Sequence, residues 1–249
     1  MIEWYARAQS IVSQETVVIT PLGSDMAPTL PVRRLGYELR VAWDPATAGP
    51  GAFPEPSILR QILTVNGRPP RPNDEPGCMD PKPVSPEPLM MLLPEQRGDF
   101  AFTFAGRGRV DGRSVMMFDF KGVAGGEPEV TWTDECVSIS IPGRSRGRIW
   151  VDANTHDVLR LDERLVGMFE FDVPRAHQRR GAVPSIVVER ADTSIRYRRV
   201  EFSDPPDTLM LPSEVQTITV IRGGAAQRTR ISQRFSDYRR FLADARVVQ

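Results

Sequence analysis

Few residues in this chain could do chemistry, and none falls into a catalytic or metal-binding pattern. The two histidines are His156, in a predicted turn, and His177, in the segment 174–178. Two histidines are too few for a histidine-rich metal site or a paired-histidine mechanism, which argues against both. A serine–histidine–aspartate triad lacks the G-x-S-x-G elbow that would support it, and Gly143–Gly147 is typical of a hairpin connection. We therefore predict no catalytic residues, no bound metal and no enzyme.

Cofactor motifs and acid–base pairs are equally weak. Gly106-Arg107-Gly108 precedes a strand and not a helix, so it is not a nucleotide-binding fingerprint, and we predict no cofactor. The acidic pairs Asp134-Glu135 and Asp162-Glu163 could serve as general acid and base, but exposed carboxylates at strand ends are usually just hydrated. A hydrolase that uses His156 or His177 is the least favoured hypothesis.

The two cysteines, Cys78 and Cys136, are either free thiols or one disulfide. A bridge between them would close a loop of roughly 58 residues and contribute about 4 kcal/mol in the chain-entropy model. It would also hold the irregular segment around Cys78 against the sheet. We favour the disulfide, which would imply an oxidising compartment.

Composition and charge indicate a globular protein. The 249 residues are 40% hydrophobic, and the 32 basic residues balance the 32 acidic ones. No apolar run approaches the length of a membrane-spanning helix, and no global field attracts nucleic acid. We interpret the arginines of the basic C-terminal part, such as Arg228 and Arg230, as a solvated sheet face in preference to an anion site.

The elements that would position a site are mostly antiparallel strands. Asp111-Gly112 and the residues 152–156 each separate two apolar segments, which is a hairpin signal. The segment 58–65 is either a strand or a helix-to-strand segment. Further strand-like segments cover 36–42, 100–104, 115–120, 130–141, 148–151, 158–161, 185–189, 194–200, 214–221 and 228–235. A sheet of about ten strands must curl. The sequence predicts a mainly β (α+β) fold, built on a large curved antiparallel sheet or half-barrel that forms a meander over 99–241.

Helices are predicted at two places, and we expect a single β-rich domain over 1–249. A one-sided apolar stripe, which includes Trp4 and Ile11, predicts an N-terminal helix over 1–14. The proline-rich segment 69–88 is expected to be a semi-rigid loop or a flap across an opening. After it, Ser85 as N-cap and the apolar run 89–93 predict a short helix.

Several motifs together resemble a known group of proteins. They are Gly147–Asp152 with Asp157–Leu161, Met210–Val215, Phe235–Phe241, Cys78 with Asp80-Pro81, and Asp134–Cys136. Together they resemble an uncharacterised, acidobacterial-type family of secreted bacterial proteins, whose sheet is similar to the periplasmic lipoprotein-carrier (LolA/LolB-like) fold. The carriers themselves are matched only by the hairpin over 147–161 and by the "L-P-S … Y-R-x-F" ending, and their pattern lacks the proline-rich insertion.

The resemblance implies an unclosed barrel with an apolar cavity that receives acyl chains. The residues that could line this cavity are Phe100, Phe102, Phe104, Met116, Phe118 and Phe120. The favoured hypothesis is a non-enzymatic periplasmic or secreted protein that binds a lipid, a lipoprotein or another apolar ligand in the concave face of its sheet.

The alternative is a filled core, in which the same side chains only pack and the proline-rich segment contacts an envelope protein partner. Residues 1–8 show no basic and apolar leader. We therefore expect either a cytoplasmic protein or a periplasmic or secreted one whose signal peptide has been removed.

Overall fold

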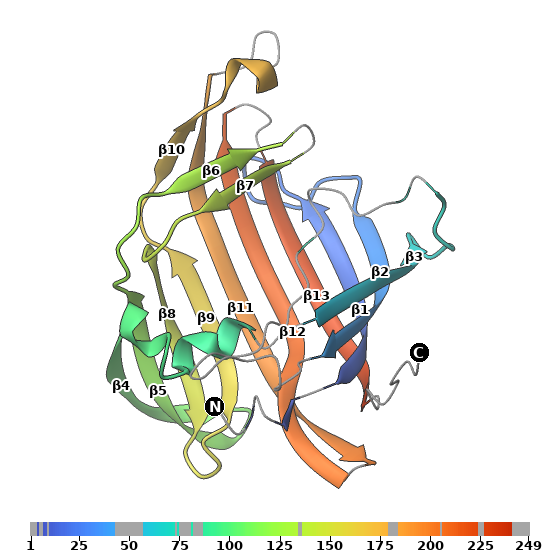
Figure 1. Ribbon diagram of the computed structural model, residues 1–249, viewed down its shortest axis with the longest axis vertical. Helices are drawn as coiled ribbons and strands as arrows, with labels where there is room; N and C mark the ends of the chain where they lie inside the picture. Colours follow the sequence, from blue (N-terminus) through green and yellow to red (C-terminus); the bar gives the residue numbers. More distant parts are fainter. Residues whose placement is uncertain are drawn as a thin grey trace, which may run out of the picture.

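The main feature of the computed structural model is one open antiparallel sheet. The structure describes residues 4, 7, 8, 10–42, 57–72, 74, 81, 87–133, 136–178, 184–204, 206–223 and 227–240. The sheet has 11 strands in the order β3-β2-β1-β13-β12-β11-β9-β8-β5-β4, with β10 paired to β11 outside this path. Figure 1 shows it strongly twisted, with its edge strands β3 and β4 far apart. The predicted mainly β fold with a large curved sheet is confirmed, and the sheet does not close.

The bounds of the elements are as follows. The strands are β1 (Ile11–Pro21), β2 (Arg33–Ala42), β3 (Ser57–Val65), β4 (Phe100–Val110), β5 (Arg113–Gly122), β6 (Glu129–Trp132), β7 (Val137–Ser140), β8 (Ser145–Asp152), β9 (Val158–Leu165), β10 (Phe169–Asp172), β11 (Ser185–Ser203), β12 (Pro206–Arg222) and β13 (Gln227–Arg240). The short 3-10 helices are η2 (Glu87–Leu92), η3 (Arg97–Asp99) and η4 (Arg175–His177). No helix among the described residues is long and apolar enough to span a membrane.

The connections between the strands follow from turn residues. Asp111 and Gly112 have φ angles of 48° and 79°, and Asn66 and Gly67 have φ angles of 50° and 80°. Positive φ at both central residues is the requirement of a type I′ turn, which Asn-Gly and Asp-Gly meet with little strain. The predicted hairpin between β4 and β5 is therefore confirmed, as is the turn after β3.

The N-terminal prediction was wrong over its last residues. Trp4 and Arg7 are helical, but the helix predicted to reach residue 14 gives way to β1 at Ile11. β1 lies between β13 and β2, so it joins the two ends of the chain within one sheet. Pairing on both sides outweighs the weak helical stripe, because each strand neighbour satisfies the backbone groups of β1.

Two further strands differ from the sequence-based expectation. The predicted strand 130–141 is in fact the hairpin β6–β7, closed where the Thr133 N–H donates to the carbonyl oxygen of Cys136 at 2.8 Å. This hairpin forms a separate sheet that crosses the upper part of the main one (Figure 1). The segments predicted over 185–189 and 194–200 are one continuous strand, β11.

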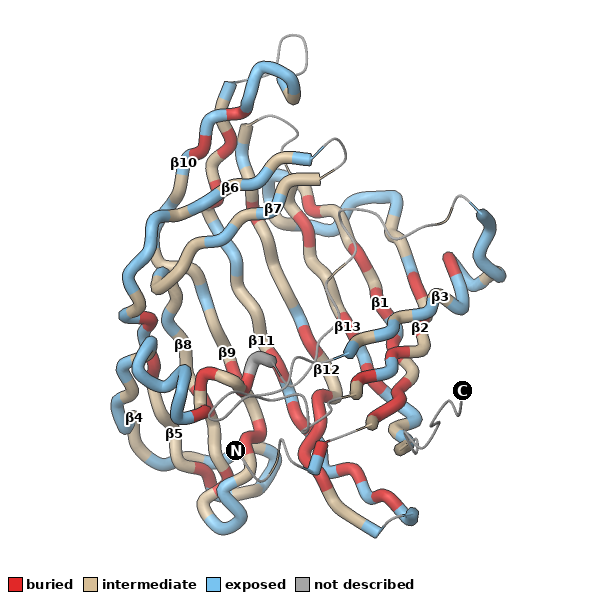
Figure 2. Tube along the Cα trace, viewed as in Figure 1, coloured by how far each residue is buried: buried red, intermediate tan, exposed pale blue. Residues whose placement is uncertain are grey.

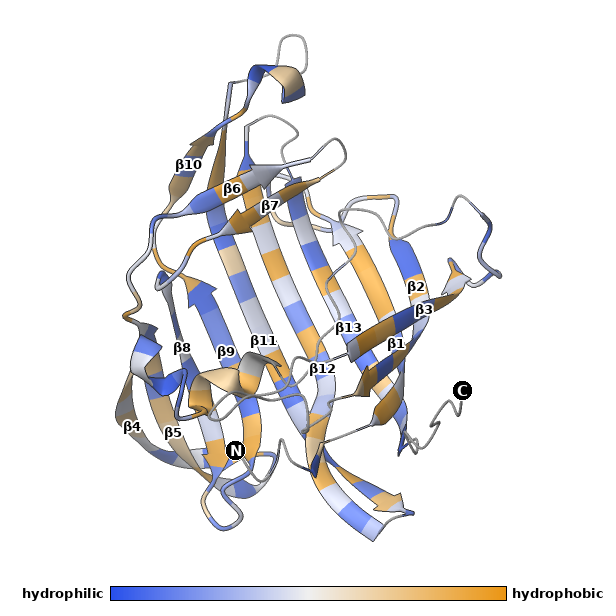
Figure 3. Ribbon diagram, viewed as in Figure 1, coloured by the Kyte–Doolittle hydropathy of each residue, from blue (hydrophilic) through white to orange (hydrophobic). Residues whose placement is uncertain are grey.

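Hydrophobic side chains alternate along the strands and gather on one face of the main sheet, which we call the core face. Ile149 of β8 and Leu161 of β9 face each other across the strands and are both 1% exposed. Figure 2 shows buried residues interspersed with half-buried and exposed ones, and Figure 3 shows the matching change of hydropathy. The opposite side, which we call the outer face, carries the alternating polar residues.

Candidate ligand-binding face

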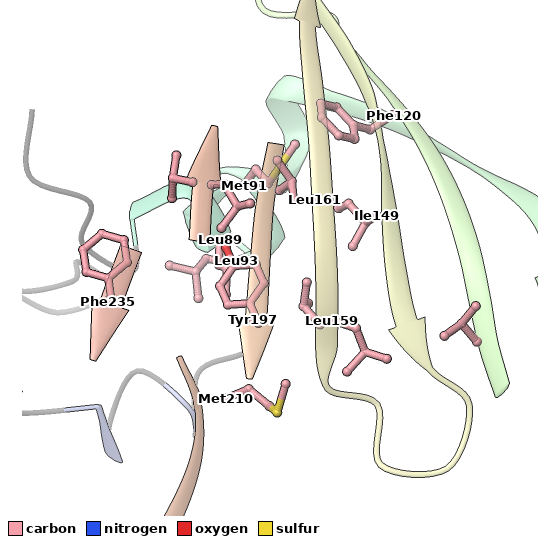
Figure 4. Close-up of a cluster of buried hydrophobic side chains, with 14 of the residues drawn as sticks. Leu89, Met91, Leu93, Phe120, Ile149, Leu159, Leu161, Tyr197, Met210 and Phe235 are labelled. Atoms are coloured by element: carbon pink, nitrogen blue, oxygen red, sulfur yellow. The ribbon is translucent and has the colours of Figure 1, made fainter. Parts of the chain in front are cut away.

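The core face is covered by η2 and the residue that follows it. Leu89, Met91 and Leu93 are 2%, 7% and 0% exposed and belong to the largest hydrophobic cluster of the described residues. In Figure 4 they lie beside Leu161 and Tyr197 of the sheet. The predicted short helix is thus confirmed in a 3-10 form, although Ser85, its predicted cap, lies outside the described residues. The core beneath η2 is filled by the protein's own side chains.

A group of aromatic rings extends the core face toward the edge strand β4. The ring centroids of Phe100 and Phe102 lie 6.0 and 6.3 Å from that of Phe120, which is 2% exposed. Farther along the hairpin, Phe104 and Phe118 pair edge to face at 5.7 Å. Phe104 is 55% exposed. These five phenylalanines, which we call the aromatic row, therefore run from the buried core to solvent.

The β4–β5 turn positions the aromatic row. From the turn at Asp111-Gly112, the register sets Phe102 opposite Phe120 and Phe104 opposite Phe118, with one bulge between Phe104 and Gly106. Because side chains two residues apart share a face, all five rings lie on the same side of the hairpin. Phe118 is also directly opposite the buried Ile149 of β8, which identifies that side as the core face.

The sixth residue predicted for the cavity is Met116, which has no ring and lies on the same face as the five phenylalanines. It is half-buried and opposite Val151 of β8. The structure thus places five of the predicted residues in two groups of ring contacts, a trio around Phe120 and the pair of Phe104 and Phe118. An apolar cavity bounded by all six stays a prediction, and only Phe120 borders the groove described further below.

A buried polar cluster on the core face was missed by sequence reasoning. The Glu15 carboxylate accepts hydrogen bonds from Arg60 Nε at 2.8 Å and Nη2 at 2.7 Å. It also accepts one from Gln233 Nε2 at 2.8 Å, and the Glu15 side chain is 0% exposed. The Arg60 guanidinium lies 3.9 Å from the Tyr37 ring centroid and donates to the carbonyl oxygen of Pro81. Arg60 thus connects the sheet to the proline-rich segment.

The remaining candidate residues lie apart from the aromatic row. His156 occupies the turn between β8 and β9 with a φ angle of 60°, and the His177 ring stacks on Trp132 at 5.8 Å. Within the described ranges, no group of three or more His, Cys, Asp and Glu could hold a metal ion. No free cysteine occurs among these residues. Cys78 lies outside them, so its pairing with Cys136 stays a prediction.

Comparisons with known proteins find similarity only at the level of structure. No protein-family model matches the sequence, and no curated protein matches it. A solved DUF1329 family protein from Desulfovibrio piger is similar, with 12% identity, a TM-score of 0.41 and coverage of 97% of this chain and 90% of that one. A LolA superfamily protein from Nitrosomonas europaea is similar with 11% identity, a TM-score of 0.33 and the same coverage, 97% and 90%. Both TM-scores are below 0.5, so neither similarity assigns a function to this chain.

Proposed function

We propose that this chain is a non-enzymatic carrier-type protein that shields an acyl chain, or a comparable apolar ligand, on the core face of its open sheet. The observation that supports this most directly is the aromatic row. It begins in the core at Phe120 and ends at Phe104, which remains 55% exposed beside an unpaired sheet edge. Exposed large apolar side chains that are continuous with a core are typical of a binding surface.

The binding would depend on burial and not on bond making. Each methylene group removed from water contributes about 0.8 kcal/mol, so an alkyl chain of several carbons lying on these rings would gain useful affinity. A longer chain would have to displace side chains of η2 and of the residue after it, because Leu89 and Leu93 now fill this part of the core. The exposed end of the aromatic row is therefore where a ligand would make its first contact.

A filled scaffold is the second candidate function. The burial of Leu89 at 2% and Leu93 at 0% favours it, because a core this full needs no ligand. In that case the proline-rich segment, which Arg60 ties to the sheet through Pro81, would contact an envelope protein. We further propose a periplasmic or secreted location, supported by the predicted Cys78–Cys136 disulfide and testable by non-reducing peptide mass spectrometry.

A fluorescent fatty acid titrated into the purified full chain tests the carrier proposal. We expect saturable binding that is weakened at least tenfold in the Phe104→Ser, Phe118→Ser double variant, since both rings of the exposed pair are lost. The matched control is Leu59→Ser on the opposite edge strand β3, where the side chain is 57% exposed. Equal loss in the control, or no saturable binding by the unmodified chain, would favour the filled scaffold.

A further inference from the structure

A groove of about 790 Å³ lies across β4, β5, β8, β9, β11 and β12, and Phe120 is the one member of the aromatic row that borders it. Several of the residues that line it are next to buried core residues in sequence. Asp119 and Lys121 flank Phe120, and Arg148 and Trp150 flank Ile149. Since successive side chains point to opposite sides of a strand, the groove opens on the outer face.

Three cations stand side by side in this groove. The register places Arg146 of β8 directly opposite Lys121 of β5 on one side and Arg164 of β9 on the other. All three side chains are exposed and line the groove. Neighbouring strands are about 4.8 Å apart, so the three positions, which we call the basic row, span about 10 Å. Like charges that are directly opposite across strands repel and destabilise the sheet.

The carboxylates around the basic row form their short hydrogen bonds with other residues. Asp119 pairs with Arg148 at 2.6 Å, and this hydrogen bond, with smaller contributions from the charges of Arg148 and Arg164, holds the pKa of Asp119 below its usual range. Asp162 accepts from Arg160 at 2.6 Å and from Ser194 at 2.7 Å.

Asp192, which is opposite Arg164, pairs instead with Arg190 at 2.5 Å. Glu163 also borders the groove, but it shares strand parity with the buried Leu161 and so belongs to the core face. Within the part of the chain that the structure describes, no ion pair within 4.0 Å joins a carboxylate to Lys121, Arg146 or Arg164.

We propose that the basic row binds the phosphate group of a phosphate-bearing small molecule in this groove. Three adjacent cationic side chains that form no ion pair within 4.0 Å among the described residues match the oxygens of a phosphate or diphosphate, which guanidinium groups bind through paired hydrogen bonds. A groove of this size exceeds a single phosphate, and Trp150 and Ile218 add apolar surface for the rest of the ligand. The inference is independent of acyl binding on the core face.

Isothermal titration of the full chain with inorganic pyrophosphate at low ionic strength tests this site. We expect one saturable site, weakened at least tenfold in Arg146→Gln, the central residue of the basic row. The matched control is Arg230→Gln, on the outer face of β13 but outside the groove, where we expect a change of less than twofold. Absence of binding, or equal loss in both variants, would overturn the proposal.

Thermal unfolding provides a second readout that does not depend on affinity alone. Arg146→Gln relieves the repulsion between Arg146 and its two cationic neighbours. Without ligand, the variant should therefore melt at the same temperature as the unmodified chain or slightly higher. Pyrophosphate should no longer raise the melting temperature of the variant. A variant that melts lower and is still stabilised by pyrophosphate to the same degree would contradict the assignment.

Two ligand sources share this chemistry, and they can be separated. Short-chain phosphatidic acid, used below its micelle concentration, probes a lipid headgroup, and glycerol phosphate probes a soluble ester. Binding of either that is lost in Arg146→Gln supports the site and identifies the source. A different result would overturn the groove site. In that case pyrophosphate and glycerol phosphate do not bind, and phosphatidic acid binding is lost only in the Phe104→Ser, Phe118→Ser variant. The ligand would then belong to the core face.

Discussion

Replacing Arg60 by methionine should destabilise this protein severely, because it leaves a buried carboxylate without its cation. The Glu15 side chain is 0% exposed, and that of Arg60 is 11% exposed. Two of the three hydrogen bonds that Glu15 receives come from Arg60, so only the bond from Gln233 would remain. Removing one partner of a buried ion pair costs about 3–5 kcal/mol, and we expect Arg60→Met to fall in that range.

Urea unfolding of the full chain, followed by tryptophan fluorescence and circular dichroism, measures this loss. The matched control is Arg40→Met, which breaks the 2.6 Å pair with Glu38 on β2, where the arginine side chain is 50% exposed. An exposed pair contributes at most about 1 kcal/mol, so the control should change little. Adding Glu15→Gln to Arg60→Met should recover much of the loss, since no buried charge remains. If Arg60→Met costs no more than Arg40→Met, the reasoning from burial is refuted.

Three other substitutions test further parts of the structure. Asp152 Oδ1 accepts two backbone N–H groups of the β8–β9 turn, at 2.8 and 3.0 Å, which hold its pKa below the usual range. The stability from this carboxylate is therefore present above the ordinary aspartate pKa and lost as pH falls through the lower folded-state pKa. Asp152→Asn should cost about 1.5–3 kcal/mol at neutral pH and little in strong acid, as urea unfolding across pH would show. Gly147→Ala should lower the stability by about 1–3 kcal/mol in thermal unfolding, because the new Cβ would lie 2.0 Å from a carbonyl oxygen of β9. The control Gly125→Ala should be neutral, because its Cβ would meet nothing within 4 Å. Leu93→Ala, at a position 0% exposed, should lower the free energy of unfolding in urea by about 2–5 kcal/mol. The control Leu30→Ala, at a position 85% exposed, should lower it by at most about 0.5 kcal/mol. Equal effects would contradict the packing of Leu93 against the core.

The parts of the fold that local chemistry dictates could be predicted from the sequence. Asp111-Gly112 and Asn66-Gly67 identify their turns because few other residue pairs adopt the required positive φ angles. Alternation along each strand puts Phe102 and Phe104 on one face of β4, but counting from the turn does not give their partners, because the bulge between Phe104 and Gly106 shifts the register by one residue. The five phenylalanines could therefore be picked out as a group from the sequence, and their lining of a cavity stays a prediction.

The parts that depend on distant partners could not be predicted. β1 places Ser13 and Glu15 at core positions, both buried, and these polar residues break the alternation that would reveal a strand. Glu15 is tolerated there only because Arg60 and Gln233, from β3 and β13, surround its carboxylate. The basic row was missed for a similar reason, because it exists only when the registers of β5, β8 and β9 are known together.

The most direct test of the carrier proposal is native mass spectrometry, with lipid extraction, on the chain purified from its own envelope fraction. We predict a bound acyl species at stoichiometric occupancy in the unmodified chain and in Leu59→Ser, and its loss when Phe104 and Phe118 are both replaced by serine. A ligand-free mass, with no uptake of added fatty acid or lipopeptide, would contradict the proposal and identify the core as filled.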